Sequence, residues 1–406
     1  MVSRKDYLMN TWTDVVGTLS VRRVVNASGT MTSLGASSAT REAIEAATRI
    51  LPVFVAIDEL QRHASQVIAV STGAESGFVT ACAAAGLTLG VAGAITGSDP
   101  GAIAKLPDTN GMRNEVVIQA GHLVDYGALI EQTLRVPGVD VRVVGSATDV
   151  NENQLRAALT EHTAAAVYVV SHHCVQRGQI PLMDFIRVCH ECRVPVIVDA
   201  ASEYDLRGFI NHGADLVVYS AHKFLGGLTA GIVAGRADLV RACYFNQLGV
   251  GRAMKVGKEG IVGAIAALDA WARRDHEAVR RREEKRVRRW LEILQRPGLQ
   301  LELSPDPTGN PITRLRVNVD VDLVGCAAWD IARELMRGDT VIAVRTDGIN
   351  LGYFELDPCN LSDEEALLTG ERILATVEAA SSGKVSATDY GAWHQENIDA
   401  HYNWPN

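Results

Sequence analysis

Two ionisable side chains follow apolar runs of this 406-residue sequence, and their types suit covalent amine chemistry. Asp199 ends the run Val196–Asp199, and Lys223 comes shortly after the run Asp215–Tyr219. A lysine at the carboxyl edge of a sheet is partly removed from water, which lowers the pKa of its amine and suits Schiff-base formation. A buried aspartate needs a cationic partner, and a protonated pyridine nitrogen is such a cation. Alone, each residue is better explained as a surface lysine or a helix cap.

A third segment predicts a binding loop for an anion. An apolar strand is expected at 67–70 and a helix of small residues at 78–89. The backbone amides of Gly73, Ala74 and Glu75 would then lie at a helix N-terminus, where small side chains let a phosphate approach. A simple N-cap explains this segment by itself, but together with the aspartate and the lysine it predicts a pyridoxal phosphate site. No glycine-rich nucleotide motif follows any expected strand, which argues against nicotinamide and nucleoside triphosphate cofactors.

Short apolar runs alternate with helical patterns between residues 65 and 235. Runs without polar alternation are typical of strands that helices cover on both faces. We therefore expect an α/β fold with a mostly parallel seven-stranded sheet, helices on both faces and a small α+β domain at the C-terminal end. The expected strands are 67–70, 115–118, 141–144, 165–170, 194–198, 215–219 and 231–234.

Changes in pattern along the chain predict five segments. A long helix after residue 260 is rich in arginine, but acidic residues lie among the arginines, so a solvated helix that joins two domains is favoured over a basic binding patch. The expected segments are an N-terminal arm (1–22), a large cofactor-binding domain (23–260), the linking helix (261–296), a small α+β domain (297–385) and a C-terminal arm (386–406).

Composition excludes several classes of protein. The chain carries 48 acidic and 39 basic side chains, a formal charge of −9, which disfavours nucleic-acid partners. No apolar stretch is long enough to cross a membrane and the start lacks a signal-like apolar region, so we expect a cytoplasmic protein without a membrane partner. The seven cysteines are scattered, and the C-x-x-C pair Cys189 and Cys192 has no second ligand pair, so neither a disulfide framework nor a metal site is expected.

Longer motifs resemble a known family. Asp199 and the segment Ser220–Lys223 resemble motifs of the fold-type-I pyridoxal-phosphate enzymes, whose fold is that of aspartate aminotransferase. Three further segments resemble the selenocysteine synthase-like branch, which includes D-glucosaminate-6-phosphate ammonia-lyase. These segments are Val25–Thr32, Leu106–Val116 and Gly251–Glu259, and the similarity extends over residues 20–380.

The resemblance implies roles for the cofactor-site residues. Lys223 would hold pyridoxal phosphate through a Schiff base and then act as general acid and base at the substrate Cα. Asp199 would keep the pyridine nitrogen protonated, and His122 would stack on the ring. The remaining expected cofactor contacts are Ser202, Ser220 and His222.

The same resemblance implies residues for the substrate. Arg345 ends an expected strand, at the position from which small domains of this fold bind a substrate carboxylate, although an interdomain ion pair is the alternative. Arg252 and Lys255 are expected to face the active site of a second subunit in a homodimer or higher homo-oligomer, and interface salt bridges explain them equally well. Ser28 and Thr30, in the first resembling segment, are further substrate-binding candidates.

One more strand end carries two histidines. The segment Ser171–Cys174 follows the expected strand at 165–170, so its histidines are placed to touch the cofactor or the substrate. We take His173 as a catalytic candidate alongside Lys223 and His122. The sequence leaves open whether His172 or His173 faces the cofactor.

The expected activity is that of a pyridoxal-phosphate enzyme acting at the Cα of a small amino acid or amino-sugar acid. The resemblance favours a lyase that performs α,β-elimination with ammonia release. Racemisation by Lys223 and a histidine as two acid/bases is the main alternative, transamination a further one and aminoacyl-tRNA selenium transfer a remote one. The lysine motif reads Ser-Ala-His-Lys, whereas ammonia-lyase relatives carry a motif closer to Ser-Gly-Gly-Lys, so the substrate's identity does not carry over.

Overall fold

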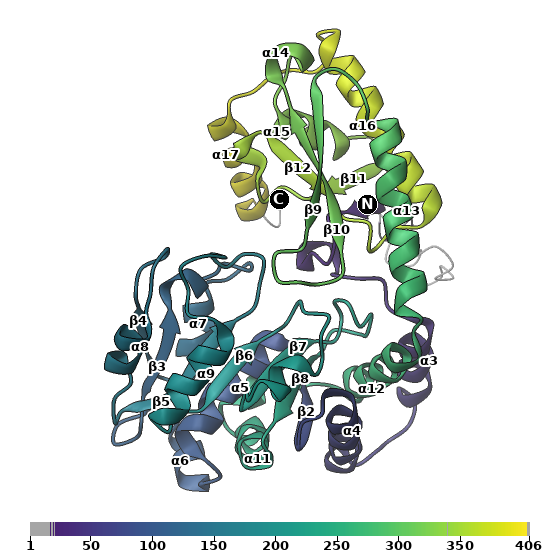
Figure 1. The fold of residues 1–406 in the computed structure, drawn as a ribbon. Helices are drawn as coiled ribbons and strands as arrows, with labels where there is room; N and C mark the ends of the chain where they lie inside the picture. Colours follow the sequence, from purple (N-terminus) through teal and green to yellow (C-terminus); the bar gives the residue numbers. More distant parts are fainter. Residues whose placement is uncertain (1–16, 18, 20, 339, 404–406) are drawn as a thin grey trace. The chain divides into compact units, whose positions relative to one another are not determined.

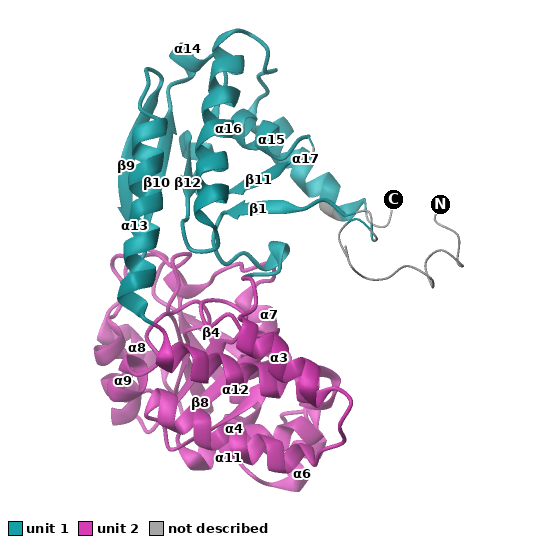
Figure 2. Ribbon diagram, turned by 90° about the vertical axis from the view of Figure 1, so that its right-hand side faces the viewer, with its two compact units in different colours: residues 1–36, 275–406 teal, residues 37–274 magenta. Residues whose placement is uncertain are grey.

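The chain forms two units in the computed structural model, which describes residues 17, 19, 21–338 and 340–403. Unit 1 comprises residues 1–36 and 275–406, and unit 2 comprises residues 37–274 (Figure 2). Unit 2 is therefore a continuous insertion between the two segments of unit 1. The expected N-terminal arm at 1–22 falls almost wholly outside the described residues.

Unit 2 is built on a seven-stranded sheet in the order β2-β8-β7-β6-β5-β3-β4 (Figure 1). Neighbouring strands are parallel except where β8 pairs with β2 and with β7. The predicted mostly parallel sheet is thereby confirmed. The strands are β2 (Ser76–Thr80), β3 (Glu115–Gln119), β4 (Asp140–Val144), β5 (Thr163–Val169), β6 (Val196–Asp199), β7 (Leu216–Ser220) and β8 (Gly231–Gly235).

Side chains of the central strands alternate between two apolar layers. Val196 and Val198 of β6 pack in one layer, whereas Ile197 between them packs in the other. Helices supply the opposite wall of each layer, which explains why these strands lack polar alternation. The first layer uses α4 (Ile57–Thr72), α8 (Glu152–Ala158), α9 (Leu182–Glu191) and α12 (Lys258–Arg273), and the second uses α5 (Ala83–Thr96), α7 (Ile130–Arg135) and α11 (Ala237–Phe245). Unit 2 also contains α3 (Arg41–Ile50), α6 (Pro100–Lys105) and α10 (Gly208–Asn211).

The strand expected at 67–70 is wrong, because these residues belong to α4. Ile68 is fully buried whereas Val70 is 74% exposed, so the run lies on an amphipathic helix and not on a strand buried on both sides. Gly73 ends this helix with a φ of +76°, a conformation that favours glycine. Gln61 of α4 then fixes the edge strand β2 by bonding both backbone groups of Val79, at 2.9 and 2.8 Å.

Unit 1 combines a three-stranded antiparallel sheet, in the order β12-β10-β9, with a parallel pair formed by β1 and β11. The strands are β1 (Val24–Ala27), β9 (Leu299–Pro305), β10 (Thr313–Val319), β11 (Val341–Val344) and β12 (Tyr353–Leu356). The helices are α13 (His276–Ile293), α14 (Val321–Val324), α15 (Ala328–Leu335), α16 (Asp363–Ser381) and α17 (Tyr390–Tyr402). Trp290 lies fully buried in the core of this unit and donates a 2.7 Å hydrogen bond to the Ala366 carbonyl.

The unit boundaries differ from those expected from the pattern. Strand β1 pairs with β11, so the segment after residue 23 belongs to unit 1 and not to the large domain. The expected linking helix at 261–296 is two helices, because α12 ends at Arg273 and Asp275 caps α13 by accepting from the Ala278 backbone amide. Among the described residues, no helix has the length and apolar character needed to span a membrane.

Candidate active site

The predicted lysine and aspartate lie at the same edge of the unit 2 sheet. Asp199 is the last residue of β6, and Lys223 follows the parallel neighbour β7. The Lys223 amine donates a hydrogen bond to the Ser202 hydroxyl. Ser220 and His222, which precede this lysine, bond each other, with Oγ and Nδ1 3.1 Å apart. The structure therefore brings five of the predicted cofactor residues together at the carboxyl ends of two adjacent strands.

Asp199 is a buried carboxylate whose charge is incompletely compensated. Asp199 is only 7% exposed, and its Oδ1 accepts a 3.0 Å hydrogen bond from the Ala201 backbone amide. Burial raises the pKa of Asp199, against the lowering effects of that hydrogen bond and of the Lys223 charge. A cation bound beside this carboxylate would restore its ordinary ionisation.

Two glycines shape the loop that carries the lysine. Gly226 has a φ of +65°, and its backbone amide donates to the Lys223 carbonyl at 3.0 Å. Its own carbonyl accepts from the Thr40 backbone amide at 2.7 Å, and a Cβ at this glycine would lie 3.0 Å from the Thr40 methyl group. Gly227 then donates to the Ala221 carbonyl at 2.7 Å. These bonds fix the backbone on both sides of Lys223, so its side chain leaves from a defined position.

His122 lies at the end of β3 and is held in one tautomer. It closes the short 3-10 helix η2 (Ala120–His122), and its Nδ1 accepts a 3.1 Å hydrogen bond from the Val169 backbone amide. A nitrogen that accepts a hydrogen bond carries no proton, so the neutral ring carries its proton on Nε2. Burial lowers the pKa of His122 to about 4. This histidine is therefore an uncharged hydrogen-bond donor at neutral pH.

The segment expected to bind an anion, residues 73–75, does not lie near the lysine. Gly73, Ala74 and Glu75 precede β2, and the start of β2 is level with the start of β7, because Ser76 and Leu216 both pair with Gly235. The three residues consequently lie at the opposite edge of the sheet from the lysine. Glu75 instead accepts a 2.9 Å hydrogen bond from the Ala237 backbone amide. Their expected cofactor role is corrected accordingly.

The first turn of α5 occupies the place expected for that loop. Thr80 at the end of β2 and Ser220 at the end of β7 both pair with Gly231, so α5 begins beside the lysine segment. Cys82 caps the helix by accepting from the Ala85 backbone amide at 3.4 Å. A Cβ at Gly231 would lie 2.3 Å from the Cys82 carbonyl, so only glycine lets the loop pack here. The run of small residues 81–85 after an apolar strand was the sequence signal for this site.

The loop after β5 also reaches this edge. The His173 backbone amide donates to the Ser171 hydroxyl at 3.2 Å, and the ring centroids of His172 and His173 are 3.9 Å apart. Cys174 is buried, which raises the pKa of its thiol to about 12, and the thiol lies 3.5 Å from the Val169 carbonyl. This thiol stays protonated and is not a nucleophile at neutral pH. The role of His173 stays a prediction.

Arg252 and Lys255 are exposed on unit 2. Arg252 lies in the 3-10 helix η4 (Val250–Met254), and Lys255 follows its end. Arg252 and Lys255 are both exposed, so a second molecule can reach them. Their expected role toward another subunit stays a prediction.

The predicted substrate residues of unit 1 lie in a rigid turn and at a strand end. Asn26 holds the turn by accepting from the Ser28 backbone amide at 3.0 Å and from its hydroxyl at 2.8 Å. Thr30 follows directly and is half-buried. Arg345 is 5% exposed, and its Nε lies 2.7 Å from Asp347 Oδ2. Its buried Nη2 has no hydrogen-bond partner among the described residues, as a group that awaits an anion would.

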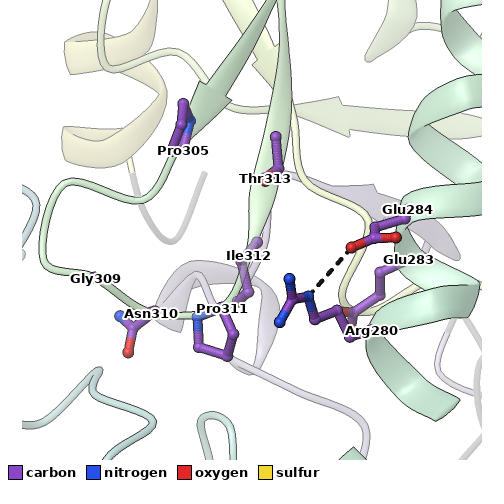
Figure 3. Close-up of a pocket in the computed structure, with 9 residues that line it drawn as sticks. All are labelled: Arg280, Glu283, Glu284, Pro305, Gly309, Asn310, Pro311, Ile312 and Thr313. Atoms are coloured by element: carbon purple, nitrogen blue, oxygen red, sulfur yellow. Dashed lines mark hydrogen bonds and ion pairs between the residues drawn. The ribbon is translucent and has the colours of Figure 1, made fainter. Parts of the chain in front are cut away.

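A separate cavity of about 310 Å³ lies in unit 1 between α13 and the turn that joins β9 to β10 (Figure 3). Arg280 and Glu284 form an ion pair of 3.2 Å at its wall, beside the largely buried Glu283. None of the residues predicted for the cofactor or the substrate lines this cavity.

The sheet order, the lysine after β7 and the buried aspartate at the end of β6 define the class of fold-type-I pyridoxal-phosphate enzymes. An aspartate aminotransferase from Thermus thermophilus shares this fold, with a TM-score of 0.54 and 17% identity over 93% of this chain and 99% of that one. The profile of the family "SelA: L-seryl-tRNA selenium transferase" matches residues 24–294. The chain therefore belongs to the SelA family.

Two relatives resemble the chain over nearly its whole length. The D-glucosaminate-6-phosphate ammonia lyase of Salmonella typhimurium is 38% identical over 89% of this chain and 98% of its own. A solved structure of D-glucosaminate-6-phosphate ammonia-lyase superposes with a TM-score of 0.82 and 37% identity, over 91% of this chain and all of that one. The 5'-C-glycyluridine monooxygenase-decarboxylase of a Streptomyces species is 35% identical over 91% of this chain and 94% of its own.

The residues at the carboxyl edge fit the cofactor that this class implies. Asp199 has the raised pKa of a carboxylate that awaits a cation, as the pyridine nitrogen would supply. The amine of Lys223 lies at the same edge, and the amides of the first turn of α5 suit a phosphate. His122 offers an aromatic ring and one N–H donor beside them.

Proposed function

We propose that this protein is a pyridoxal-phosphate lyase that removes ammonia from an amino-sugar acid by α,β-elimination. The observation that carries the proposal is the pairing of Lys223 with a buried, undercompensated Asp199 at one sheet edge. The ammonia lyase from Salmonella typhimurium supports the reaction type. In the proposed reaction the α-proton and a β-hydroxyl leave the substrate, and water later replaces the amino group to give ammonia and a 2-oxo acid.

The chain's own residues have distinct tasks in this reaction. Pyridoxal phosphate, when bound, supplies an electron sink for the carbon from which the proton leaves. Lys223 Nζ takes the proton from the substrate Cα, and the Ser202 hydroxyl holds the amine in place by accepting its hydrogen bond. Asp199, which is buried from water, would hold the pyridine nitrogen in its positive form.

Elimination is favoured over racemisation by the state of His122. A racemase of the expected kind needs a second group that exchanges a proton on the opposite face of Cα. His122 has its Nδ1 engaged by the Val169 amide and a pKa of about 4, so it is a poor base at neutral pH. A base in the loop of Ser171–Cys174 would be needed in its place.

The test is a substrate screen of the cofactor-loaded protein. D-Glucosaminate, its 6-phosphate and the D- and L-forms of serine and threonine are incubated separately, and ammonia, 2-oxo acid, oxygen uptake and deuterium exchange at Cα are followed together. We expect ammonia and 2-oxo acid in equal amounts from a sugar acid, without oxygen uptake. Exchange without a 2-oxo acid would show a racemase, and oxygen uptake with carbon dioxide release would show the chemistry named for the Streptomyces relative.

Lys223→Ala provides the catalytic control. This variant should lose the visible absorbance band of the lysine-bound cofactor and all ammonia release, because it lacks the amine that holds the cofactor. Lys105→Ala removes an exposed lysine of the same unit, whose amine bonds the nearby Asn110 carbonyl and pairs with Asp108, and should retain both properties. A visible band that survives in Lys223→Ala but disappears in Lys105→Ala would remove the lysine assignment.

We propose that Arg345 binds the substrate carboxylate through its unpaired Nη2. Arg345→Ala should raise KM for a carboxylate substrate about tenfold or more, because a hydrogen bond to a charged group contributes about 1.5–3 kcal/mol. Arg316→Ala is the matched control, since Arg316 already pairs with Glu355 at 3.1 Å, and its KM should stay near the wild-type value. An unchanged KM in Arg345→Ala, measured with an intact cofactor band, would reject this role.

We also propose that the active form is a homodimer or higher homo-oligomer in which Arg252 and Lys255 reach the site of a second copy. Their exposure is compatible with this role. Sedimentation of the loaded enzyme gives its oligomeric state. Mixing Arg252→Ala with Lys223→Ala chains should then restore part of the activity, which a site confined to one chain would not allow.

A further inference from the structure

The His122 ring is held from two directions by strand β5. Its Nδ1 accepts the hydrogen bond from the Val169 amide, and its ring lies 4.4 Å, centroid to centroid, from the Tyr168 ring. The two rings are nearly perpendicular, at 88°, an arrangement that aromatic quadrupoles favour. Consecutive residues of one strand thus fix both the rotation of the imidazole and its position.

Tyr168 is itself anchored in the apolar layer of unit 2. Its ring packs against Phe185 of α9 with centroids 5.3 Å apart and planes at 67°. Burial raises the pKa of its hydroxyl to about 12, so the ring stays uncharged. The support that Tyr168 gives to His122 therefore comes from a neutral ring that is itself packed against Phe185.

The backbone before His122 is also held closely. The Gly121 carbonyl accepts a 3.0 Å hydrogen bond from the Val175 amide, and a Cβ at Gly121 would lie 2.5 Å from the Gln179 side chain. The loop of residues 120–122 therefore has little freedom of its own. The His122 ring nitrogen that β5 does not bond is Nε2, and this nitrogen carries the proton of the neutral ring.

We propose that Tyr168 is a positioning residue that, with the Val169 amide, fixes His122 as a permanent Nε2–H donor toward the bound cofactor. This inference rests on the proposed cofactor site and deepens it. It assigns His122 to binding and orientation, with no proton exchange, and leaves Lys223 as the proton carrier at Cα.

The experiment compares Tyr168→Leu with Tyr168→Phe by titrating each apoprotein with pyridoxal phosphate. Tyr168→Leu should weaken cofactor affinity about three- to tenfold, as expected for the loss of one aromatic pair, and should change the visible circular dichroism of the bound cofactor. Tyr168→Phe keeps the ring and should restore both readouts to near wild type. Phe209→Leu, which removes a ring from the same apolar layer at a site where Phe209 packs on Tyr219, is the control for general loosening and should affect neither.

Two results would overturn the proposal. The first is wild-type affinity and dichroism in Tyr168→Leu, and the second is a defect in Tyr168→Phe as large as that in Tyr168→Leu. These readouts need no turnover, so they remain valid if no substrate releases ammonia. Failure of the proposed lyase reaction can therefore be distinguished from failure of the positioning role of Tyr168.

A measurement on the unaltered protein keeps the proposal testable if Tyr168→Leu does not fold. Nitrogen-15 spectra of histidine-labelled protein report the tautomer and the protonation of His122, assigned by comparison with His122→Phe. From pH 5 to pH 9 we expect a neutral ring with its single proton on Nε2. The ring should gain a second proton, on Nδ1, only as the pH approaches about 4. A His122 signal that titrates near the ordinary value of 6.5, or a ring protonated at Nδ1, would overturn the assignment.

Discussion

Asp357 in unit 1 and Asp199 in unit 2 are both buried carboxylates, but their pKa values are shifted in opposite directions. Asp357 in unit 1 is 1% exposed, and burial would raise its pKa, but the charge of Arg314 and hydrogen bonds from Cys359 hold the pKa below 3.8. Asp199 in unit 2 is 7% exposed and has a raised pKa, because burial outweighs the bond from Ala201 and the charge of Lys223. Asp357 therefore has its compensating cation within the chain, whereas the charge of Asp199 is undercompensated, as its proposed role beside a cationic cofactor nitrogen requires.

The largest effect should come from removing the cation that unit 1 supplies. Arg314 bonds Asp306 at 2.9 Å and Asp357 at 2.8 Å, so Arg314→Met leaves two buried carboxylates unpaired. Breaking a buried ion pair in this way costs about 3–5 kcal/mol of unfolding free energy. The more exposed Arg316 lies on the same strand, and Arg316→Met should cost less than about 1 kcal/mol. Urea unfolding of the three proteins measures the difference, and equal midpoints for both variants would contradict it.

The next effect concerns catalysis and should leave stability intact. Asp199→Asn removes the charge that we propose stabilises the cofactor's positive nitrogen, and preorganised groups of this kind contribute about 100- to 1,000-fold to kcat. The urea midpoint of the apoprotein should not fall, because the variant no longer buries an undercompensated charge. Asp357→Asn should show the reverse pattern, with lower stability and the visible cofactor band retained. If Asp199→Asn kept full kcat, the contrast between the two carboxylates would have no functional meaning.

The smallest effect is a difference in pH dependence between the two asparagine variants. The pKa of Asp357 is lowered from 3.8, so this residue stabilises the fold above pH 3.8 and that contribution disappears as the pH falls through its folded-state pKa. The pKa of Asp199 is raised from 3.8, so ionisation destabilises the apoprotein as the pH rises above 3.8 toward its folded-state pKa.

Urea midpoints of the apoproteins between pH 3 and pH 7 test these signs. As the pH rises, the urea midpoint of Asp199→Asn should increase relative to that of the wild type, whereas the midpoint of Asp357→Asn should decrease relative to it. Saturation with pyridoxal phosphate should abolish the gain of Asp199→Asn, since the cofactor supplies the missing cation. Parallel curves for both variants would contradict the assignment.

The core of the site could be predicted from sequence because buried parallel strands leave a strong local signal. Asp199 and Lys223 follow continuous apolar runs, and the carboxyl ends of adjacent parallel strands meet at one edge. The tautomer of His122 could not be predicted, because it depends on the Val169 amide, which lies 47 residues away.

The strand at 67–70 was predicted wrongly because four apolar residues fit a strand and a helix equally well. At 67–70 the choice depends on tertiary contacts, above all on Gln61, which bonds Val79 and makes the later segment the strand. The boundary of unit 1 was missed for a similar reason. Strand β1 has too few residues to show which domain it joins, and its partner β11 lies more than 300 residues later in the chain.

The pairing of β1 with β11 constrains the order in which the two units can fold during synthesis on the ribosome. Val24 pairs with Val341, so β1 has no strand partner until more than 300 further residues have been synthesised. At about 5–20 residues per second, that delay lasts about 15–60 seconds. Unit 2 is continuous in sequence and emerges during this interval, so it is able to fold first. Strand β1 meanwhile lacks the partner beside which its apolar side chains are buried, so this segment is accessible to chaperones during that interval.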